Sequence, residues 1–267
     1  MTFKTKAPVL FISHGAPTFA LEPSQLGPQL NALGQTLAHI RAVLVVSPHW
    51  QTRGVKVSTA SVPETVHDFG GFPAALFKLQ YPAAGAPELA REVGELLAQS
   101  GWPVGTDERR GLDHGAWVPL MHLFPNANVP VFQVSMPHDL TTASAFQLGQ
   151  VLAPMRDQGV LILGSGSMTH NLYEFRELAS KPEAYVVEFT KWVRQTVQSK
   201  DASRLMDYRR LAPHALRAHP TEEHFLPLLL AMGASANDET VEVLNGGIDH
   251  CVLSMESYAW GTSHTVV

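Results

Sequence analysis

Three apolar runs of this sequence end at a histidine. The run in "VLFISHG" stops at His14, the run in "VLVVSPHW" stops at His49, and the run in "VLILGSGSMTH" is followed by His170. Imidazole binds divalent metals and exchanges protons near neutral pH, so these positions suit metal-centred or acid–base chemistry. The chain holds 13 histidines and a single cysteine, which excludes a cysteine-based metal cluster.

Two other positions could join the same chemistry. His224 lies in "TEEHFLPLLL", and Asp113 and His114 lie between two glycines in "GLDHGAW". Asp113 is a candidate to orient His114, with a plain turn-forming role as the equal alternative. For any one histidine alone, the ordinary interpretation is a half-buried ring bonded to the backbone. The repeated placement after apolar runs favours a shared site.

The apolar runs that must position these histidines have the length and composition of buried strands. Strands are predicted near residues 8–13, 42–47, 55–60, 131–135, 160–164, 241–244 and 251–256. Helical patterns are found near residues 26–40, 87–101, 141–159, 182–197 and 220–234, the last with Thr221 as a candidate N-cap.

This alternation predicts an α/β fold: one domain over residues 1–267, layered α/β/α around a central mixed, largely parallel sheet. The last two strands would add an antiparallel edge. Sites in open α/β sheets form outside the carboxyl ends of the strands. We therefore expect His14, His49 and His170 to converge on one crevice.

Composition excludes several classes of partner. The net charge is −5 and no basic stripe is present, so nucleic acid is not an expected partner. The apolar runs are too short to span a membrane. A lone cysteine permits no internal disulfide, and we expect a cytoplasmic monomer or small homo-oligomer. "GSGSMTH" lacks the lysine of a phosphate-binding loop and the order of a nucleophile elbow.

A glycine- and proline-rich segment at residues 62–87 is rich in aromatic residues and is expected to form a lid or a substrate wall. Within it, His67 and Phe69 are candidate substrate-binding residues, as is His219 further along the chain; His67 and His219 could instead only fix turns. Arg53 and Arg217 are the candidates to bind a substrate carboxylate.

Six short motifs together resemble a known family. They are "SHGAP", "SPHW", "HDFGGFP", "DHGAW", "GSGSMTHNL" and "HPTEEHFLPLLLAMGA", in this order. They resemble the class III extradiol ring-cleavage dioxygenases of the protocatechuate 4,5-dioxygenase B-subunit type, and among these the 4,5-DOPA extradiol dioxygenase branch. The resemblance extends from about residue 8 to residue 256.

The resemblance implies metal ligands at His14, His49 and His224, an acid/base at His170 and a second substrate-facing histidine at His114. The wider class has a carboxylate as its third ligand, whereas the DOPA branch resembles this chain in having histidine there. Glu223 stays an alternative, although neighbours on a helix point about 100° apart and only one can face the ion.

The function that the resemblance implies is Fe(II)-dependent cleavage of a DOPA-like catechol by O₂ to a hydroxymuconate semialdehyde. The partners would be a small-molecule catechol and O₂, with Zn²⁺ as another occupant of the same site. Two alternatives stay open: a zinc-dependent hydrolase with the same histidine site, and a non-catalytic binding module on this fold.

Overall fold

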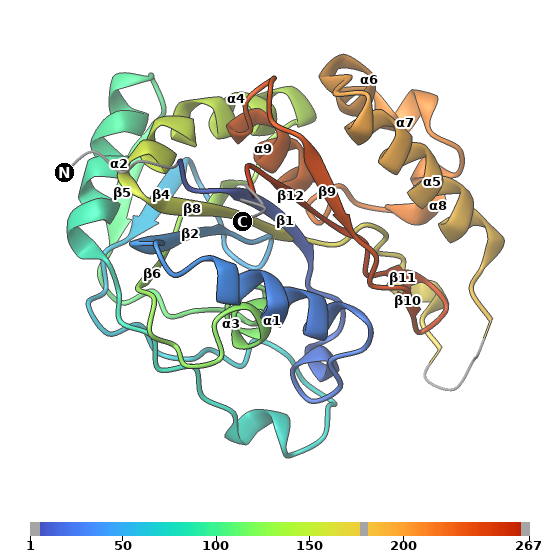
Figure 1. The fold of residues 1–267 in the computed structure, drawn as a ribbon, viewed down its shortest axis with the longest axis horizontal. Coiled ribbons are helices and arrows are strands. Elements are labelled where there is room, and N and C mark those ends of the chain that lie inside the picture. Colours follow the sequence, from blue (N-terminus) through green and yellow to red (C-terminus); the bar gives the residue numbers. More distant parts are fainter. Residues whose placement is uncertain (1–5, 177–180, 263–267) are drawn as a thin grey trace.

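The computed structural model describes residues 6–176 and 181–262, and its centre is a six-stranded sheet (Figure 1). The strands, in order across the sheet, are β6 (Val131–Gln133), β2 (Ala42–Val46), β8 (Val160–Gly166), β1 (Val9–Ser13), β12 (Ser257–Trp260) and β9 (Val241–Leu244). β6, β2, β8 and β1 are parallel, whereas β12 pairs antiparallel with both β1 and β9. The predicted mixed, largely parallel sheet with an antiparallel edge is confirmed.

Helices cover both faces of this sheet (Figure 1). One face carries α1 (Leu26–Thr36) and α3 (His114–Leu123); the other carries α2 (Pro87–Gln99), α4 (Thr142–Leu152), α5 (Ala184–Gln198) and α9 (Leu226–Ala234). Strand β8 shows why both faces need cover. Its Leu161 and Leu163 pack with α1 and α3, while Val160 and Ile162 pack with the other layer.

Shorter elements complete the described chain. They are η1 (Pro17–Ala20), β3 (Gln51–Thr52), β4 (Val55–Ser58), η2 (Leu76–Lys78), β5 (Val104–Asp107), β7 (Met136–Pro137), η3 (Ala153–Gln158), η4 (Leu172–Glu174), α6 (Ala202–Met206), α7 (Tyr208–Leu211), α8 (Ala215–Ala218), β10 (Ile248–Asp249) and β11 (Leu253–Ser254). The predicted strand near 55–60 forms β4, which pairs with β5 outside the central sheet. Across residues 6–176 and 181–262, no helix has the length and apolar character needed to cross a membrane.

Two predictions near the C-terminus are wrong. The strand expected at 251–256 does not pair with β9; Ser257–Trp260 does. His250 and Cys251 have φ angles of 50° and 67°, a left-handed conformation that breaks an extended strand. The helix expected at 220–234 begins only at Leu226, with proline in its first turn. The Thr221 hydroxyl binds a neighbouring carboxylate instead of capping that helix.

Candidate metal centre

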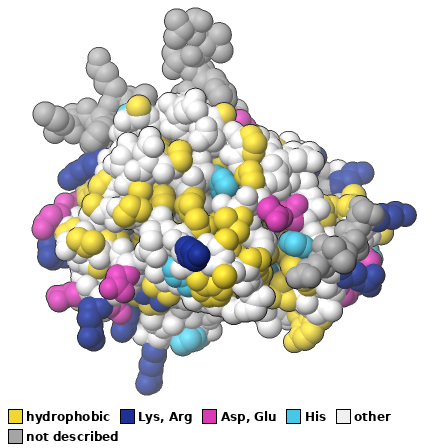
Figure 2. Space-filling view, turned by 90° about the horizontal axis from the view of Figure 1, so that it is seen from below, with side chains coloured by type: hydrophobic (Ala, Val, Ile, Leu, Met, Phe, Trp, Pro, Cys, Tyr) yellow, Lys and Arg dark blue, Asp and Glu magenta, His cyan; other side chains and the backbone are white. Residues whose placement is uncertain are grey.

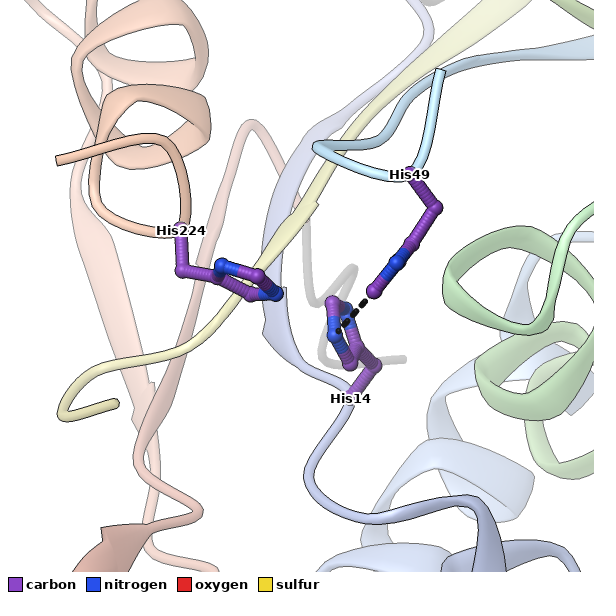
Figure 3. A group of neighbouring side chains, drawn as sticks. All are labelled: His14, His49 and His224. Carbon is purple, nitrogen blue, oxygen red and sulfur yellow. Dashed lines mark hydrogen bonds between the residues drawn. The ribbon is translucent and has the colours of Figure 1, made fainter. Parts of the chain in front are cut away.

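Three histidines meet at the carboxyl edge of the sheet. His14 directly follows β1, His49 follows β2, and His224 comes from the turn that leads into α9. Figure 3 shows the three rings pointing toward one another. The Nε2 atoms of His14 and His49 lie 3.2 Å apart, and one ring nitrogen from each of the three residues lies within 4.8 Å of the others.

This spacing fits one metal ion. Two imidazole nitrogens held about 2.1 Å from one ion, at angles between octahedral and tetrahedral, would lie about 3.0–3.4 Å apart. The 3.2 Å between His14 and His49 falls in that interval. The Nε2 atom of His224 is buried and has no hydrogen-bond partner in the described structure. An orphaned buried nitrogen is costly unless something binds it, and a cation would do so.

The hydrogen bonds behind His14 fix its tautomer. The Ser165 hydroxyl on β8 donates its hydrogen to the carbonyl of Gly115. Ser165 Oγ must therefore accept from His14 Nδ1, which lies 3.0 Å away. His14 then carries its hydrogen on Nδ1 and offers the Nε2 lone pair to the centre of the cluster, as metal-binding histidines do when an acceptor lies behind the ring.

Each of the other two rings has a carboxylate on the Nδ1 side, within hydrogen-bond distance only for His224. His49 Nδ1 lies 3.6 Å from Asp68 Oδ2, and His224 Nδ1 lies 3.1 Å from Glu223 Oε1. Both contacts favour a hydrogen on Nδ1 and leave Nε2 free to bind a metal. Glu223 therefore lies behind His224, on the side of the ring away from His14 and His49.

Burial keeps these rings neutral. Burial, followed by repulsion from neighbouring imidazoles, holds the pKa of His14 and of His224 well below the usual 6.5. Burial, with the nearby His114 ring, lowers the pKa of His49 to about 4. Neutral imidazole is the form that coordinates a metal, so the cluster is ready to bind one at neutral pH.

Two glycines allow this close packing. A Cβ on Gly166 of β8 would lie 2.3 Å from the carbonyl oxygen of His224. A Cβ on Gly115 would lie 2.4 Å from Ser47 Oγ and 3.0 Å from His49 Cδ2. Gly166 in "GSGSMTH" thus brings the His224 segment onto the strand.

Two further histidines stand beside the triad. His170 stacks on His224, with ring centroids 3.4 Å apart and planes 11° apart, and burial lowers the pKa of His170 to about 4. His114 opens α3, and its Nδ1 lies 2.9 Å from Asp68 Oδ1, which also accepts its backbone N–H at 2.9 Å. Both rings line the same cavity. The five histidines predicted as metal ligands or proton-transfer groups are therefore brought together.

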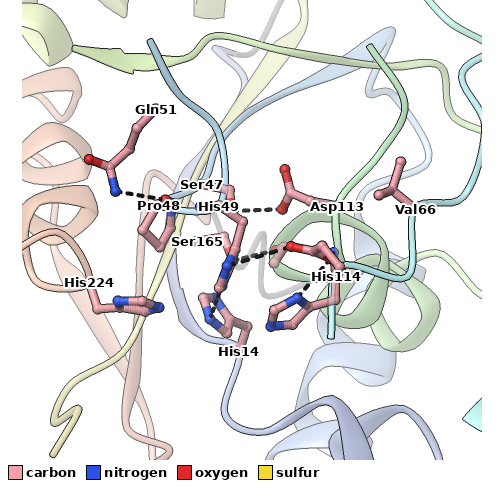
Figure 4. A network of polar contacts seen from close by, with 12 residues as sticks. His14, Ser47, Pro48, His49, Gln51, Val66, Asp113, His114, Ser165 and His224 are labelled. Atoms are coloured by element: carbon pink, nitrogen blue, oxygen red, sulfur yellow. Dashed lines mark hydrogen bonds and ion pairs between the residues drawn. The ribbon is translucent and has the colours of Figure 1, made fainter. Parts of the chain in front are cut away.

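The expectation that Asp113 orients His114 is wrong. The Asp113 carboxylate accepts from Ser47 Oγ at 2.7 Å, Arg110 Nη2 at 2.7 Å and Gln133 Nε2 at 2.8 Å. Its bond to Ser47 is drawn in Figure 4. Asp113 thus ties the start of α3 to β2 and β6, and the group that orients His114 is Asp68.

Asp68 was missed in the sequence although its neighbours His67 and Phe69 were singled out. Burial by itself would raise the pKa of Asp68, but the bonds and charge of His114 outweigh it and lower the pKa to about 2. The carboxylate is therefore ionised at neutral pH. The sequence feature that could have pointed to Asp68 is its position as an acidic residue within an irregular, aromatic-rich loop.

A cavity of about 380 Å³ opens above the histidines. Phe69 lines it, as predicted, together with four residues that were not predicted: Phe72, Leu172, Phe175 and Leu253. His67 does not line it, because its ring packs behind Phe69 and bonds to the Leu79 carbonyl.

His219 also lies outside this lining, contrary to expectation. It is fully buried, and its Nε2 bonds to the Met168 carbonyl at 2.9 Å. Its ring packs among Phe189, Tyr208 and Phe225. His219 therefore belongs to the hydrophobic core and does not face the cavity.

A model of the "Catalytic LigB subunit of aromatic ring-opening dioxygenase" matches residues 9–259. The chain belongs to this family. It is 39% identical over 254 residues to "4,5-DOPA dioxygenase extradiol" of Beta vulgaris, covering 93% of this chain and 94% of the relative. It is 37% identical over 262 residues to the Escherichia coli (strain K12) protein of the same name, covering 96% of both.

The fold of this dioxygenase also matches a solved structure. The crystal structure of an uncharacterized protein from Escherichia coli K12 aligns with a TM-score of 0.80 and 31% identity, covering 95% of this chain and 99% of the other. The family resemblance and the expectation of an extradiol dioxygenase-type enzyme are confirmed.

Proposed function

We propose that this chain is a non-haem Fe(II)-dependent extradiol dioxygenase that opens the ring of a catechol to a hydroxymuconate semialdehyde. The observation that supports the proposal most is the convergence of three imidazoles, each with Nδ1 turned toward an acceptor and Nε2 left for a metal. His14, His49 and His224 would hold the ion. Bound iron supplies the redox chemistry between catechol and O₂ that zinc lacks.

The neighbouring histidines would serve in proton transfer and substrate binding. His170 stands in the cavity wall, stacked on His224, where a neutral imidazole can accept the proton of a catechol hydroxyl and later return it. General acid–base catalysis of this kind contributes about 10²–10⁴-fold to a rate. His114 would anchor the substrate or assist, because the Asp68 carboxylate behind Nδ1 holds the ring in place at the cavity wall.

The cavity would supply orientation and exclude water. Its apolar walls remove water from the reacting atoms and suit an aromatic ring. Phe69 lies edge-on to His114, with ring centroids 5.6 Å apart, so an aromatic side chain borders the cavity next to the histidines.

The test is anaerobic reconstitution with Fe(II), followed by oxygen uptake and a visible-absorbance scan with a panel of catechols. We expect stoichiometric O₂ consumption and a new visible band with the iron protein, and neither with the zinc protein. Hydrolytic turnover by the zinc protein without O₂ would instead identify a zinc hydrolase, the alternative with the same ligands.

Two variants separate metal binding from proton transfer. His14→Ala should lose stoichiometric iron, because one of the three Nε2 donors is gone. His170→Ala should keep the iron and lose about 10²–10⁴-fold in turnover. Metal analysis beside oxygen uptake gives both results, and near-normal turnover by His170→Ala would remove this residue from the mechanism.

A further inference from the structure

The cavity walls that would face a ring substituent are hydrocarbon. Beyond the histidines, the large lining side chains are those of Phe69, Phe72, Leu172, Phe175 and Leu253. The wall stays apolar out to the surface, where Leu172 is 55% exposed. Figure 2, seen from below, shows hydrophobic side chains gathered across the middle of the face with histidines among them; a Lys or Arg and an Asp or Glu side chain also lie there, whereas the other Lys and Arg lie toward the periphery.

No charged side chain of residues 6–176 and 181–262 lines this cavity. Arg217, a sequence candidate for a substrate carboxylate, bonds Glu174 at 2.8 and 2.9 Å and stacks 4.1 Å over the Tyr185 ring. Arg53, the other candidate, is not among the lining residues. Arg176 is exposed, and its charge acts on Glu174. Arg217 therefore already faces an anion, and neither Arg53 nor Arg176 is among the residues that line the cavity.

We infer that the preferred substrate is a catechol whose ring substituent is uncharged and apolar, such as an alkyl or phenyl group, and not an amino acid side chain. The inference rests on the proposed function. A carboxylate or ammonium against these walls would lose water without gaining a partner, whereas an alkyl group gains from burial. The cavity of about 380 Å³ is larger than a catechol ring needs, so a substituent fits inside it.

A matched pair of ligands tests this. 4-Propylcatechol and 3-(3,4-dihydroxyphenyl)propanoate differ only in whether the chain ends in methyl or carboxylate. Their Kd values are measured by calorimetry on the Fe(II)-loaded protein without oxygen, where no turnover occurs. We expect propylcatechol to bind at least about tenfold more tightly, the effect of leaving one charged group unpaired. Equal or tighter binding of the propanoate overturns the inference.

A second test introduces a positive charge at the exposed edge of the cavity. Leu172→Arg should narrow the ratio of the two Kd values by about fivefold, the upper range for an exposed ion pair. Val187→Arg is the matched control, because Val187 is 49% exposed on α5 and does not line the cavity; it should leave the ratio unchanged. A ratio that Leu172→Arg does not move also overturns the inference.

Oxygen uptake with the same two catechols keeps the two claims apart. Uptake with both, together with a preference for the propanoate, would refute the inferred substrate class and leave the dioxygenase proposal standing. No uptake with either would refute the dioxygenase proposal, and the inferred substrate class with it, whatever the Kd ratio.

Discussion

Replacing Asp68 by asparagine removes one negative charge from behind two histidines and keeps the shape of the side chain. Asp68 Oδ1 accepts two bonds of 2.9 Å from His114, and Oδ2 lies 3.6 Å from His49 Nδ1. Asparagine has one oxygen to offer, and its amide nitrogen cannot accept from either ring. The variant should therefore weaken the contacts that fix the orientation of the His114 ring.

The size of the effect follows from these bonds. A hydrogen bond to a charged group contributes about 1.5–3 kcal/mol, and asparagine forfeits roughly one such interaction. That energy corresponds to about a 10–100-fold loss in kcat/KM for catechol cleavage. The Asp68 side chain is only 24% exposed, so water replaces the lost interaction incompletely.

The assay pairs oxygen-uptake kinetics with thermal unfolding, and Asp113→Asn is the comparison. Asp113 is fully buried and accepts from three side chains, so its variant should lower the Tm strongly. Asp68→Asn should lower kcat/KM with little change in Tm. Kinetics within about twofold of wild type, at equal iron content, would refute the role given to Asp68.

Three further predictions concern the support of the site. Ser165→Ala leaves His14 Nδ1 without its acceptor and should weaken metal affinity by about 10–100-fold, measured by competition with a chelator. Gly166→Ala places a Cβ 2.3 Å from the His224 carbonyl oxygen. It should lower the free energy of unfolding, measured in urea, by about 1–3 kcal/mol and weaken metal binding. An unchanged unfolding midpoint would show that the His224 segment moves away from the new Cβ without loss of stability. Burial lowers the pKa of His219 to about 3, below its unfolded value of 6.5, so the stability that it contributes is present above pH 6.5 and lost as pH falls toward 3. Between pH 7 and pH 5 the free energy of unfolding of His219→Asn should therefore fall by about 2 kcal/mol less than that of the wild type. If the free energies of unfolding of the two proteins changed in parallel with pH, this prediction would be contradicted.

The convergence of the histidines was predictable because it depends on a local rule. Each apolar strand ends at the same edge of a parallel sheet, so His14, His49 and His170 had to meet there. His224 followed from the family motif, but its place before the helix and not inside it did not. Pro227 in the first helical turn was the signal for that boundary.

The partners behind the rings were not predictable, since they come from distant parts of the chain. Ser165 lies 151 positions from His14, and Asp68 lies 46 positions from His114. Such contacts depend on how loops fold over the sheet, which strand and helix periodicity does not encode. Asp113 stands next to His114 in sequence and was preferred for that reason, yet its carboxylate turns to β2 and β6.

The most direct test of this account is an anomalous-diffraction structure of crystals soaked anaerobically with Fe(II). The account predicts one iron peak bound by the Nε2 atoms of His14, His49 and His224, with Glu223 still bonded to His224 Nδ1. Iron held by the Glu223 carboxylate, or bound between Asp68 and His114 with His224 free, would contradict it.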